Sequence, residues 1–257
     1  MTGAHLRYDR ELLLLGAKRN QELDLPEVHR YGLDSYGDAD YVSIYGLRPV
    51  DWYAKGVRLL GRTAVECTRD ALADSIGREV AAVVARAPGA NDAVLVDLFA
   101  GSGNTLYWML HHLPGSHGIA FELDPVVFAL TSRNLAALEA PIQLQHVDYE
   151  AGLASTTVAS EKLIVLFVAP PWGTALDKTN GLDLRGTTPP IAQIVDFVER
   201  RFPQNRVLFA TQIYEKVDPA SIADLKPRFD WMDVRVFDLN APGQNHGVLL
   251  GTRGFEP

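Results

Sequence analysis

Cysteine is nearly absent from this sequence, and long apolar runs are missing. The 257 residues include one cysteine, Cys67, so an internal disulfide is excluded. Apolar stretches such as Leu12–Leu15 and Leu163–Val168 are far shorter than the ~20 residues that a membrane helix needs. The N-terminus has no apolar segment of signal-peptide length. We therefore expect a cytoplasmic protein that does not span a membrane.

Positive charge is also scarce. The chain has 24 lysine and arginine residues against 32 aspartate and glutamate residues, a formal net charge of −8. Binding along a polyanion depends on many basic contacts, so extended nucleic-acid binding is not expected. The net charge does not exclude a local basic groove or a ligand the size of one nucleotide. With 47% hydrophobic and 22% charged residues, the chain can bury the core of one α/β domain.

A metal-ligand pattern is missing as well. His111 and His112 are adjacent and point to different sides of a helix, so they do not form an i, i+4 ligand pair. We predict no metal site. The sequence holds no signal for an oligomeric state.

After residue 92, β-branched runs alternate with helical patterns. Seven strands are predicted, at Ala93–Phe99, Gly118–Asp124, Ile142–Asp148, Lys162–Val168, Arg206–Gln212, Asp233–Leu239 and Gly247–Arg253. The first five are separated by segments that suit crossover helices, at Thr105–His112, Val126–Leu138, a short piece after Asp148, and Ile191–Phe202. The last two are separated only by Asn240–His246, which fits a hairpin. We therefore predict an α/β fold, with a seven-stranded, mostly parallel sheet closed by an antiparallel C-terminal hairpin. This Rossmann-like arrangement is typical of class I methyltransferases.

Residues 1–90 follow a different pattern. A helical pattern runs from Asp9 to Leu23, and a further helix is expected from Thr68 to Ala85, with Thr68 as its N-cap and Pro88-Gly89 as its stop. Between them lies an aromatic, polar segment with Tyr31, Tyr36, Tyr41, Tyr45, Trp52 and Tyr53. We interpret residues 1–90 as an extension that covers the substrate of a domain at residues 91–257. Alternatively, the aromatic residues only pack the extension onto the sheet.

The segment from Val94 to Thr105 is a buried strand that runs into a glycine-rich turn and then a helix. Gly101 and Gly103 let the backbone pass close to a ligand, and the free N–H groups of the following helix favour a carboxylate or phosphate. A Gly-x-Gly turn alone is shared by proteins that bind NAD, flavins and methyl donors. The third glycine of a dinucleotide fingerprint is missing, since its position falls on Leu106.

Acidic residues follow the first three predicted strands. Glu122 lies about twenty residues after the glycine turn, where an acid can accept hydrogen bonds from both hydroxyls of a ribose. Asp148 can accept a hydrogen bond from an adenine amino group. With Asp97, these acids suit adenosine and the cationic groups of S-adenosylmethionine better than a pyrophosphate, although each can instead cap a loop. The predicted cofactor site comprises Thr68, Asp97, Phe99, Gly101, Gly103, Asn104, Thr105, Glu122, Leu123, Asp148 and Tyr149.

The fourth predicted strand is followed by Ala169-Pro170-Pro171-Trp172-Gly173. The two prolines stop strand pairing and hold the backbone rigid. Consecutive carbonyls there can accept hydrogen bonds from an amine, and Trp172 can stack on a ring. We predict that Ala169, Pro170, Pro171 and Trp172 form the catalytic loop for a planar acceptor. Substrate contacts are predicted at Trp172, Asp183, Arg185, Tyr45 and Trp52.

These motifs resemble those of the trimethylguanosine synthase group of class I methyltransferases, which methylate the exocyclic N2 of a cap guanine. The family's Ser-Pro-Pro-Trp-Gly corresponds to residues 169–173, and its Phe-Asp-Ile-Arg to Leu182–Arg185. Its Asp-x-Phe-x-Gly-x-Gly-Gly-Asn-Thr matches Asp97–Thr105, one glycine shorter, and the resemblance spans about Thr68 to Gly254. It implies S-adenosylmethionine as cofactor, held by the three acids, and an acceptor base stacked on Trp172.

Ala169 departs from the pattern of amino-methylating relatives, which usually place Ser, Asp or Asn there. A side-chain acceptor for the target amine is therefore missing. The leading hypothesis is N-methylation of a planar amine, which is a guanine-type base in RNA, a nucleoside or a small metabolite. One alternative is a small-molecule O-methyltransferase with His246, Asp183 or Tyr45 as base. Another is a protein that binds the donor or a nucleotide without catalysis.

Overall fold

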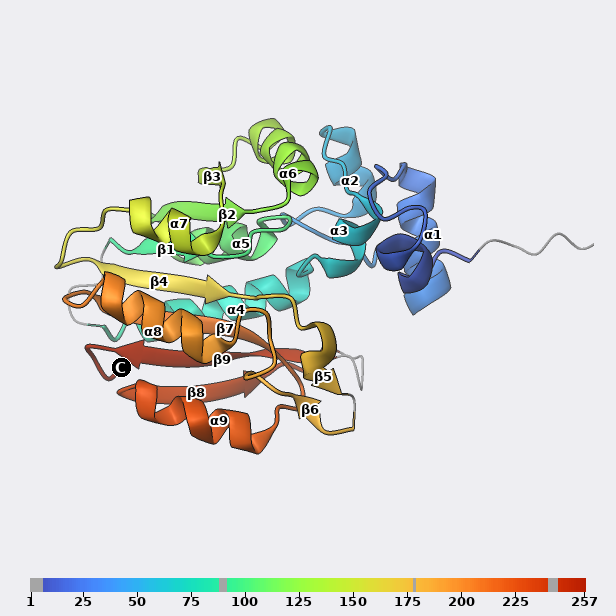
Figure 1. Ribbon diagram of the computed structural model, residues 1–257. Coiled ribbons are helices and arrows are strands. Elements are labelled where there is room, and N and C mark those ends of the chain that lie inside the picture. The colour runs from blue at the N-terminus through green and yellow to red at the C-terminus, as the bar shows by residue number, and fades with distance from the viewer. Residues whose placement is uncertain (1–6, 88–91, 178, 240–244) are drawn as a thin grey trace, which may run out of the picture.

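The computed structural model describes residues 7–87, 92–177, 179–239 and 245–257, and its centre is a seven-stranded sheet (Figure 1). The strand order is β3-β2-β1-β4-β7-β9-β8. The bounds are β1 Val94–Asp97, β2 His117–Glu122, β3 Ile142–His146, β4 Leu163–Val168, β7 Arg206–Tyr214, β8 Trp231–Val236 and β9 His246–Arg253. All neighbours pair in parallel except β9, which is antiparallel to both β7 and β8. The predicted fold class is therefore confirmed. Most of the predicted connection between the last two strands, residues 240–244, lies outside the described residues.

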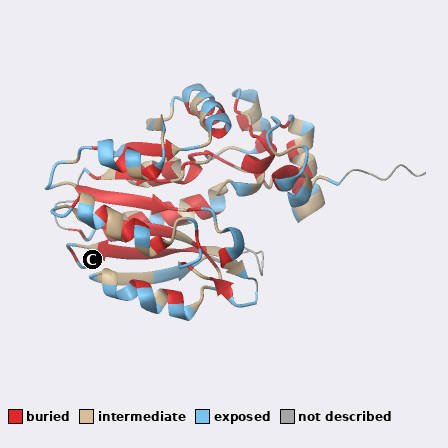
Figure 2. Ribbon diagram, in the orientation of Figure 1, coloured by how far each residue is buried: buried red, intermediate tan, exposed pale blue. Residues whose placement is uncertain are grey.

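The sheet is most buried at its centre. All six residues of β4 are buried. By contrast, the residues of β3 and β8, the two edge strands, are all partly or fully exposed. Figure 2 shows the same gradient, with buried residues along the central strands. In the parallel registers Asp97 lies opposite both Ala120 and Phe167, so β1, β2 and β4 end at the same edge of the sheet. That edge is where a doubly wound sheet binds its ligands.

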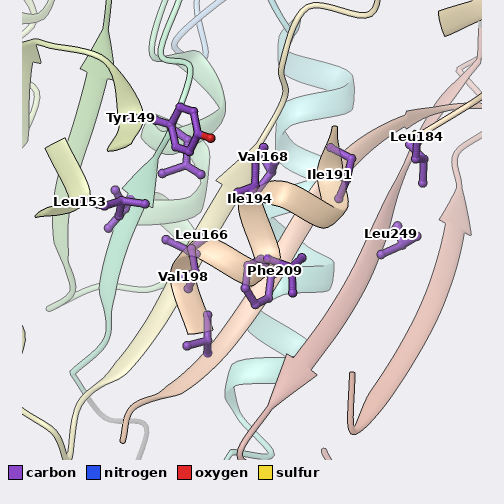
Figure 3. Packing of buried hydrophobic residues seen from close by; sticks show 14 of the residues in the cluster. Tyr149, Leu153, Leu166, Val168, Leu184, Ile191, Ile194, Val198, Phe209 and Leu249 are labelled. Atoms are coloured by element: carbon purple, nitrogen blue, oxygen red, sulfur yellow. The ribbon is translucent and has the colours of Figure 1, made fainter. Parts of the chain in front are cut away.

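Helices cover both faces of the sheet. Residues of α4 (Asp70–Val84) and α5 (Asn104–His112) pack on one face, and α6 (Pro125–Ala137) packs against β2 and β3. The other face carries α7 (Tyr149–Ser155), α8 (Ile191–Arg201) and α9 (Pro219–Leu225). Figure 3 shows how α8 directs Ile194 and Val198 onto the strands, where they meet Leu166 and Phe209. The described helices include none long and apolar enough to cross a membrane.

The N-terminal segment is organised differently from the prediction. The predicted helix at Asp9–Leu23 is wrong: only a π-helical turn, η1 (Glu11–Leu15), forms there, and the chain is extended at Gly16. The first long helix is α1 (Leu25–Tyr36), within the aromatic, polar segment for which no helix was predicted. Asp24 starts it, because its side chain accepts a hydrogen bond from the Glu27 N–H while the Glu27 carboxylate accepts one from the Asp24 N–H. Two short helices follow, α2 (Pro49–Ala54) and α3 (Gly61–Glu66).

The start of α4 also differs from the prediction. Thr68 is not the N-cap: the helix begins at Asp70, after Arg69, and has no side-chain cap. Thr68 instead donates its hydroxyl hydrogen to Oε1 of Gln212 on β7, at 2.9 Å. The predicted stop at Pro88-Gly89 lies outside the described residues. Because α4 packs on the sheet, residues 68–87 are part of the helical layer that covers the sheet.

The remaining N-terminal residues build a hydrophobic cluster beside the sheet, on the right of Figure 1. Tyr31 and Trp52 are fully buried in it. The cluster is shared with the sheet's own helices, since Leu135 of α6 is one of its buried members. The Asn134 side chain accepts a hydrogen bond from the Arg58 N–H at 2.9 Å and donates one to the Arg58 carbonyl at 2.7 Å. Residues 7–66 are thereby fixed to the edge of the sheet where α6 lies.

Candidate functional site

The glycine-rich turn after β1 is open to solvent at Gly101. Gly101 and Gly103 adopt φ angles of +51° and +73°, in the left-handed region that favours glycine. A Cβ atom placed on Gly101 would meet no atom within 4 Å. On its buried side, the turn is held by the hydroxyl of Tyr45, which donates a hydrogen bond to the Ser102 carbonyl. The turn is therefore held from the inside and open on its outer side.

Asp97 lies at the end of β1 with only 1% of its surface exposed. Its Oδ1 accepts a hydrogen bond from the Phe99 N–H at 3.1 Å. Burial raises the pKa of Asp97 to about 7, and the negative charge of Glu122 acts in the same direction. A carboxyl group that is costly to ionise in the free protein is suited to pair with a cationic ligand group.

Glu122, at the end of β2, links its strand to the glycine turn. One carboxylate oxygen accepts a hydrogen bond from the Gly101 N–H at 2.9 Å, and the other accepts one from the Asp124 N–H at 2.8 Å. Burial raises the pKa of Glu122, although these two hydrogen bonds oppose the shift. Each oxygen keeps a lone pair for a further donor. The geometry can therefore serve a pair of ribose hydroxyls beside the turn.

Leu123 and Asp148 lie at the outer end of this edge. Leu123 is 67% exposed, which gives the site an apolar surface next to Glu122. Asp148 is exposed and caps α7, because its Oδ1 accepts hydrogen bonds from the N–H groups of Glu150 and Ala151, both at 3.0 Å. Its Oδ2 makes no hydrogen bond within the described chain. Asp148 thus caps α7 with one oxygen, while its other oxygen is available for the predicted hydrogen bond from an adenine amino group.

Asn104 holds the N-terminal segment to the turn. It is 1% exposed, and its Oδ1 accepts a hydrogen bond from the Tyr45 N–H at 2.6 Å. Its amide donates to the Thr68 carbonyl at 2.7 Å and to Asp70 Oδ1 at 3.1 Å. Because these bonds occupy the side chain, its role in this structure is to position the turn. Thr105, next along α5, is 3% exposed.

Phe99 and Tyr149 pack beneath the site. Their ring centroids lie 5.5 Å apart, and Tyr149 belongs to the hydrophobic cluster under α7 and α8. Burial raises the pKa of the Tyr149 phenol, and its hydroxyl donates a hydrogen bond to Glu150 at 2.9 Å. Half-buried Phe99 lies at the margin of the turn, whereas Tyr149 mainly supports it.

The predicted catalytic loop leaves the sheet at the end of β4. Pro170 is buried, and Trp172 is partly exposed. The carbonyl of Pro171 accepts a hydrogen bond from Thr188 N–H, and that of Trp172 accepts one from Ala175 N–H. The carbonyls of Ala169 and Pro170 accept none from the described residues. These two carbonyls are therefore the ones free to bind an amine.

His246, the first residue of β9, lies against Trp172. Their ring centroids are 5.4 Å apart at an interplanar angle of 82°, and the Tyr214 ring is 6.0 Å from His246. Burial lowers the pKa of His246 to about 4, with a further contribution from the charge of Arg69. The imidazole is consequently neutral at pH 7 and can accept a hydrogen bond. Among the three bases considered from the sequence, it is the one that lies beside the catalytic loop.

Of the other predicted substrate residues, Tyr45 and Trp52 are buried, whereas Asp183 and Arg185 are partly exposed. Tyr45 is 3% exposed and Trp52 is fully buried, with its indole N–H donating to the Val42 carbonyl at 2.9 Å. Both belong to the N-terminal cluster, so the structure corrects their predicted role as substrate contacts. Asp183 and Arg185 pair with each other at 2.8 Å, and Arg185 also pairs with Asp218 and Asp224. The charge of Arg185, which follows β5 (Leu176–Asp177) and β6 (Gly181–Leu182), is thus already neutralised by Asp183 and by two acids at α9.

Two arginines near the site were not found from the sequence. Arg62 of α3 is 8% exposed, and its Nη2 lies 2.6 Å from Asp124 Oδ1, two residues beyond Glu122. Arg69 precedes α4 and places its guanidinium on the Tyr41 ring. No motif or residue spacing in the sequence marks either arginine, because the location of each side chain depends on how residues 7–69 pack against the sheet. The described residues include no cluster of ligands that could hold a metal ion.

The fold is similar to those of solved methyltransferase structures. An N-terminally shortened METTL16 methyltransferase domain matches with a TM-score of 0.53 and 14% identity, over 74% of this chain and 84% of that one. The N-terminal domain of human METTL16 in complex with SAH gives 0.52 and 13%, over 74% of this chain and 73% of that one. Another crystal form of the METTL16 domain gives 0.49 and 13%, over 68% of this chain and 65% of that one.

The chain has the class I methyltransferase fold. This confirms the fold implied by the resemblance, but these structures do not single out the trimethylguanosine synthase group. At these identities the likeness concerns the fold alone. No family model matches the sequence, and no curated protein matches it.

Proposed function

We propose that this protein is an S-adenosylmethionine-dependent methyltransferase that N-methylates a planar amine, either a guanine-type base or a small metabolite. The observation that carries the proposal is the meeting of two features at one edge of the sheet. An open glycine turn with two acids of raised pKa lies at the ends of β1 and β2, and a rigid Pro-Pro-Trp loop with free carbonyls lies at the end of β4. Because β1 and β4 pair directly, these features support the proposal that a donor and an acceptor bind side by side.

The residues at the turn fit the proposed cofactor. Asp97 pairs with its amino group, the free lone pairs of Glu122 accept from the ribose hydroxyls, and Leu123 offers an apolar surface to the adenine. The open space over Gly101 admits the chain between them. When bound, S-adenosylmethionine supplies a methyl group on a positively charged sulfur.

The acceptor loop supplies orientation. Trp172 stacks on the acceptor ring, while the carbonyls of Ala169 and Pro170 accept hydrogen bonds from its amine and direct the nitrogen lone pair toward the donor. The neutral imidazole of His246 limits where the ring can lie, because it packs edge-on against Trp172. The reaction forms a bond from nitrogen to the methyl carbon, breaks the bond from that carbon to sulfur, and releases one proton from the nitrogen to solvent.

A donor-binding protein without catalysis is the second candidate. The observation that favours it is Ala169, which gives the loop no side-chain acceptor for an amine. The two candidates share the donor site and differ only in turnover.

The first test is calorimetric titration with S-adenosylhomocysteine of the native protein and of two glycine variants. Gly101→Ala and Gly115→Ala introduce the same methyl group at positive φ with no atom within 4 Å. Backbone strain, about 1 kcal/mol, should therefore be similar in both. Only Gly101 faces the proposed donor, so we expect at least tenfold weaker binding for Gly101→Ala and unchanged binding for Gly115→Ala. Failure of the native protein to bind would overturn the proposal.

The second test is transfer of a labelled methyl group to guanosine, capped RNA and small aromatic amines. We expect transfer to at least one class of acceptor, and Trp172→Ala should abolish transfer while leaving S-adenosylhomocysteine affinity unchanged. Donor binding without transfer to any of these acceptors would favour the second candidate.

A further inference from the structure

Arg69 occupies a fixed position at the edge of the sheet where the acceptor loop lies. The residues on both sides of it are tied down. Thr68 bonds to Gln212 near the end of β7, and the Asp70 carboxylate accepts hydrogen bonds from the Trp108 indole at 2.7 Å and the Asn104 amide at 3.1 Å. In Figure 1 the start of α4 lies at the same end of the sheet as the tip of β4. The backbone at Arg69 is thus held beside the proposed acceptor site.

The guanidinium of Arg69 is also held in place. Its central carbon lies 3.6 Å from the centroid of the Tyr41 ring, while the Tyr36 ring stacks on Tyr41 at 3.4 Å and 8°. Two groups at such distances cannot share one face of a ring, so Arg69 and Tyr36 lie on opposite faces of Tyr41. Stacking on an aromatic ring orders a guanidinium while leaving its N–H edge free.

Among the described residues, no acid pairs with this cation. Within the part of the chain that the structure describes, Arg69 forms neither a salt bridge nor a side-chain hydrogen bond. The nearest acid in sequence, Asp70, is committed to Trp108, Asn104 and the Gly46 N–H. By contrast, Arg185 is paired with three aspartates. In a chain of net charge −8, an ordered and unpaired arginine is a local site for an anion.

Arg69 lies near the start of the acceptor loop, because the preceding Thr68 bonds to Gln212, and Thr211 beside Gln212 pairs with Val168, the last residue of β4. The charge of Arg69 contributes to the lowered pKa of His246, whose ring lies edge-on against Trp172 at 5.4 Å. Glu215 acts on His246 in the opposite direction. The ring of His246 thus packs against Trp172 and interacts electrostatically with Arg69.

We propose that Arg69 forms an anion subsite of the acceptor pocket, so that the methyl acceptor is an aromatic amine that carries a phosphate or carboxylate group. Trp172 stacks on its ring while the guanidinium binds the anionic group, with two parallel N–H donors where geometry allows. This inference rests on the proposed function. It favours an acceptor with an anionic group over a neutral nucleoside or a neutral amine, because a neutral acceptor would leave Arg69 without a partner.

The test compares two matched pairs of probes, titrated in the presence of saturating S-adenosylhomocysteine. Guanosine 5′-monophosphate and guanosine differ by a phosphate, and 4-aminobenzoate and aniline differ by a carboxylate. Hydrogen bonds to charged groups are stronger than those between neutral groups, so we expect the anionic member of at least one pair to bind at least tenfold more tightly. The pair that shows the preference identifies the anion as phosphate or carboxylate.

Three variants make the test specific. Arg69→Gln should abolish the preference for the anionic probe, Arg69→Lys should retain part of it, and Arg78→Gln, which removes an exposed arginine of α4 paired with Asp74, should leave it intact. Absence of a preference in both pairs, or its survival in Arg69→Gln, would overturn the anion subsite. Loss of S-adenosylhomocysteine binding by the native protein would instead count against the proposed function, since the probe pairs can also be titrated without it.

Discussion

The buried carboxyl group of Asp97 couples the stability of the ligand-free protein to pH. Its pKa rises from 3.8 to about 7 on folding, chiefly because of burial. Between these two values the folded protein keeps a proton that the unfolded chain has released, so the free energy of unfolding falls as pH rises. Above pH 7 this contribution is constant. A ligand cation that favours the charged form would remove the penalty.

We therefore predict that Asp97→Asn reduces the loss of stability between pH 5 and pH 7.5. The measurement is the thermal midpoint of both proteins across this range, without ligand. Glu122 also has a raised pKa and acts in the same direction, while the lowered pKa of His246 acts in the opposite one. For that reason the comparison is between native and variant slopes. Equal slopes would contradict the burial of an unpaired acid at this position.

The ion pair between Arg62 and Asp124 gives a second prediction at this scale. Arg62 has 9% of its side chain exposed and Asp124 has 37%, and the buried Arg62 Nε has no hydrogen-bond partner among the described residues. Asp124→Asn keeps the oxygen that caps α6 but leaves the buried guanidinium charge unpaired. Removing one partner of a buried pair is costly, whereas an apolar residue of similar volume is often neutral.

We expect Asp124→Asn to cost about 1–3 kcal/mol, a value reduced for the partial exposure of the carboxylate, and Arg62→Met to cost less. Urea unfolding of both variants tests the order. If Arg62→Met proved the more damaging change, the pair would contribute net stability.

At the scale of elements, Tyr45 connects the N-terminal segment to the glycine turn. Its backbone has a φ of +58°, an unusual value for a bulky residue, and is held there by the bond from its N–H to Asn104. Its ring packs on Tyr107 with centroids 5.5 Å apart, and its hydroxyl reaches the Ser102 carbonyl. The shape of the turn thus depends on a residue that lies 57 positions earlier.

Tyr45→Phe should lower the free energy of unfolding by about 1–3 kcal/mol, because the buried Ser102 carbonyl loses its partner. We also expect weaker binding of S-adenosylhomocysteine, since the turn is less restrained. Tyr8→Phe, which removes a hydroxyl bonded to Glu27 in the same segment, is the matched control and should leave binding unchanged. Native affinity in Tyr45→Phe would show that the turn keeps its shape unaided.

The sheet and its turn could be predicted because their signals are local. Buried strands such as Leu163–Val168 are continuous apolar runs, and the acids of the site follow the strands directly. The N-terminal segment could not be predicted, because its order comes from distant partners, as Tyr45 and Ser102 illustrate. Likewise the N-cap rule selects Thr68, but nothing local reveals that its hydroxyl bonds to Gln212, 144 residues away.

At the scale of the whole molecule, the N-terminal segment and the sheet share their core. Leu135 of α6 is buried in the N-terminal cluster, and Tyr107, Leu138 and Leu144 pack against it. The Asn134 side chain makes two hydrogen bonds with the backbone of Arg58. The Asn104 side chain bonds to the Tyr45 N–H and the Thr68 carbonyl. Removal of the segment would expose apolar surface and leave buried polar groups unpaired. We therefore expect that the parts on either side of the predicted boundary near residue 90 are not stable independently.

We predict that the full chain unfolds in a single transition, with a calorimetric enthalpy equal to the van't Hoff enthalpy. A variant that begins at residue 67, and so keeps α4 and the sheet, should lack a cooperative transition or bind hydrophobic dye in its ground state. A charge-only control in the segment, Arg48→Gln, should behave like the native protein because its ion pairs are exposed. Two resolved transitions in the full chain, together with cooperative unfolding of the shortened one, would establish the N-terminal segment as a separate unit. In that case the contacts of Tyr45 and Arg69 would be adjustable, and the segment could open and close over the acceptor without unfolding the sheet.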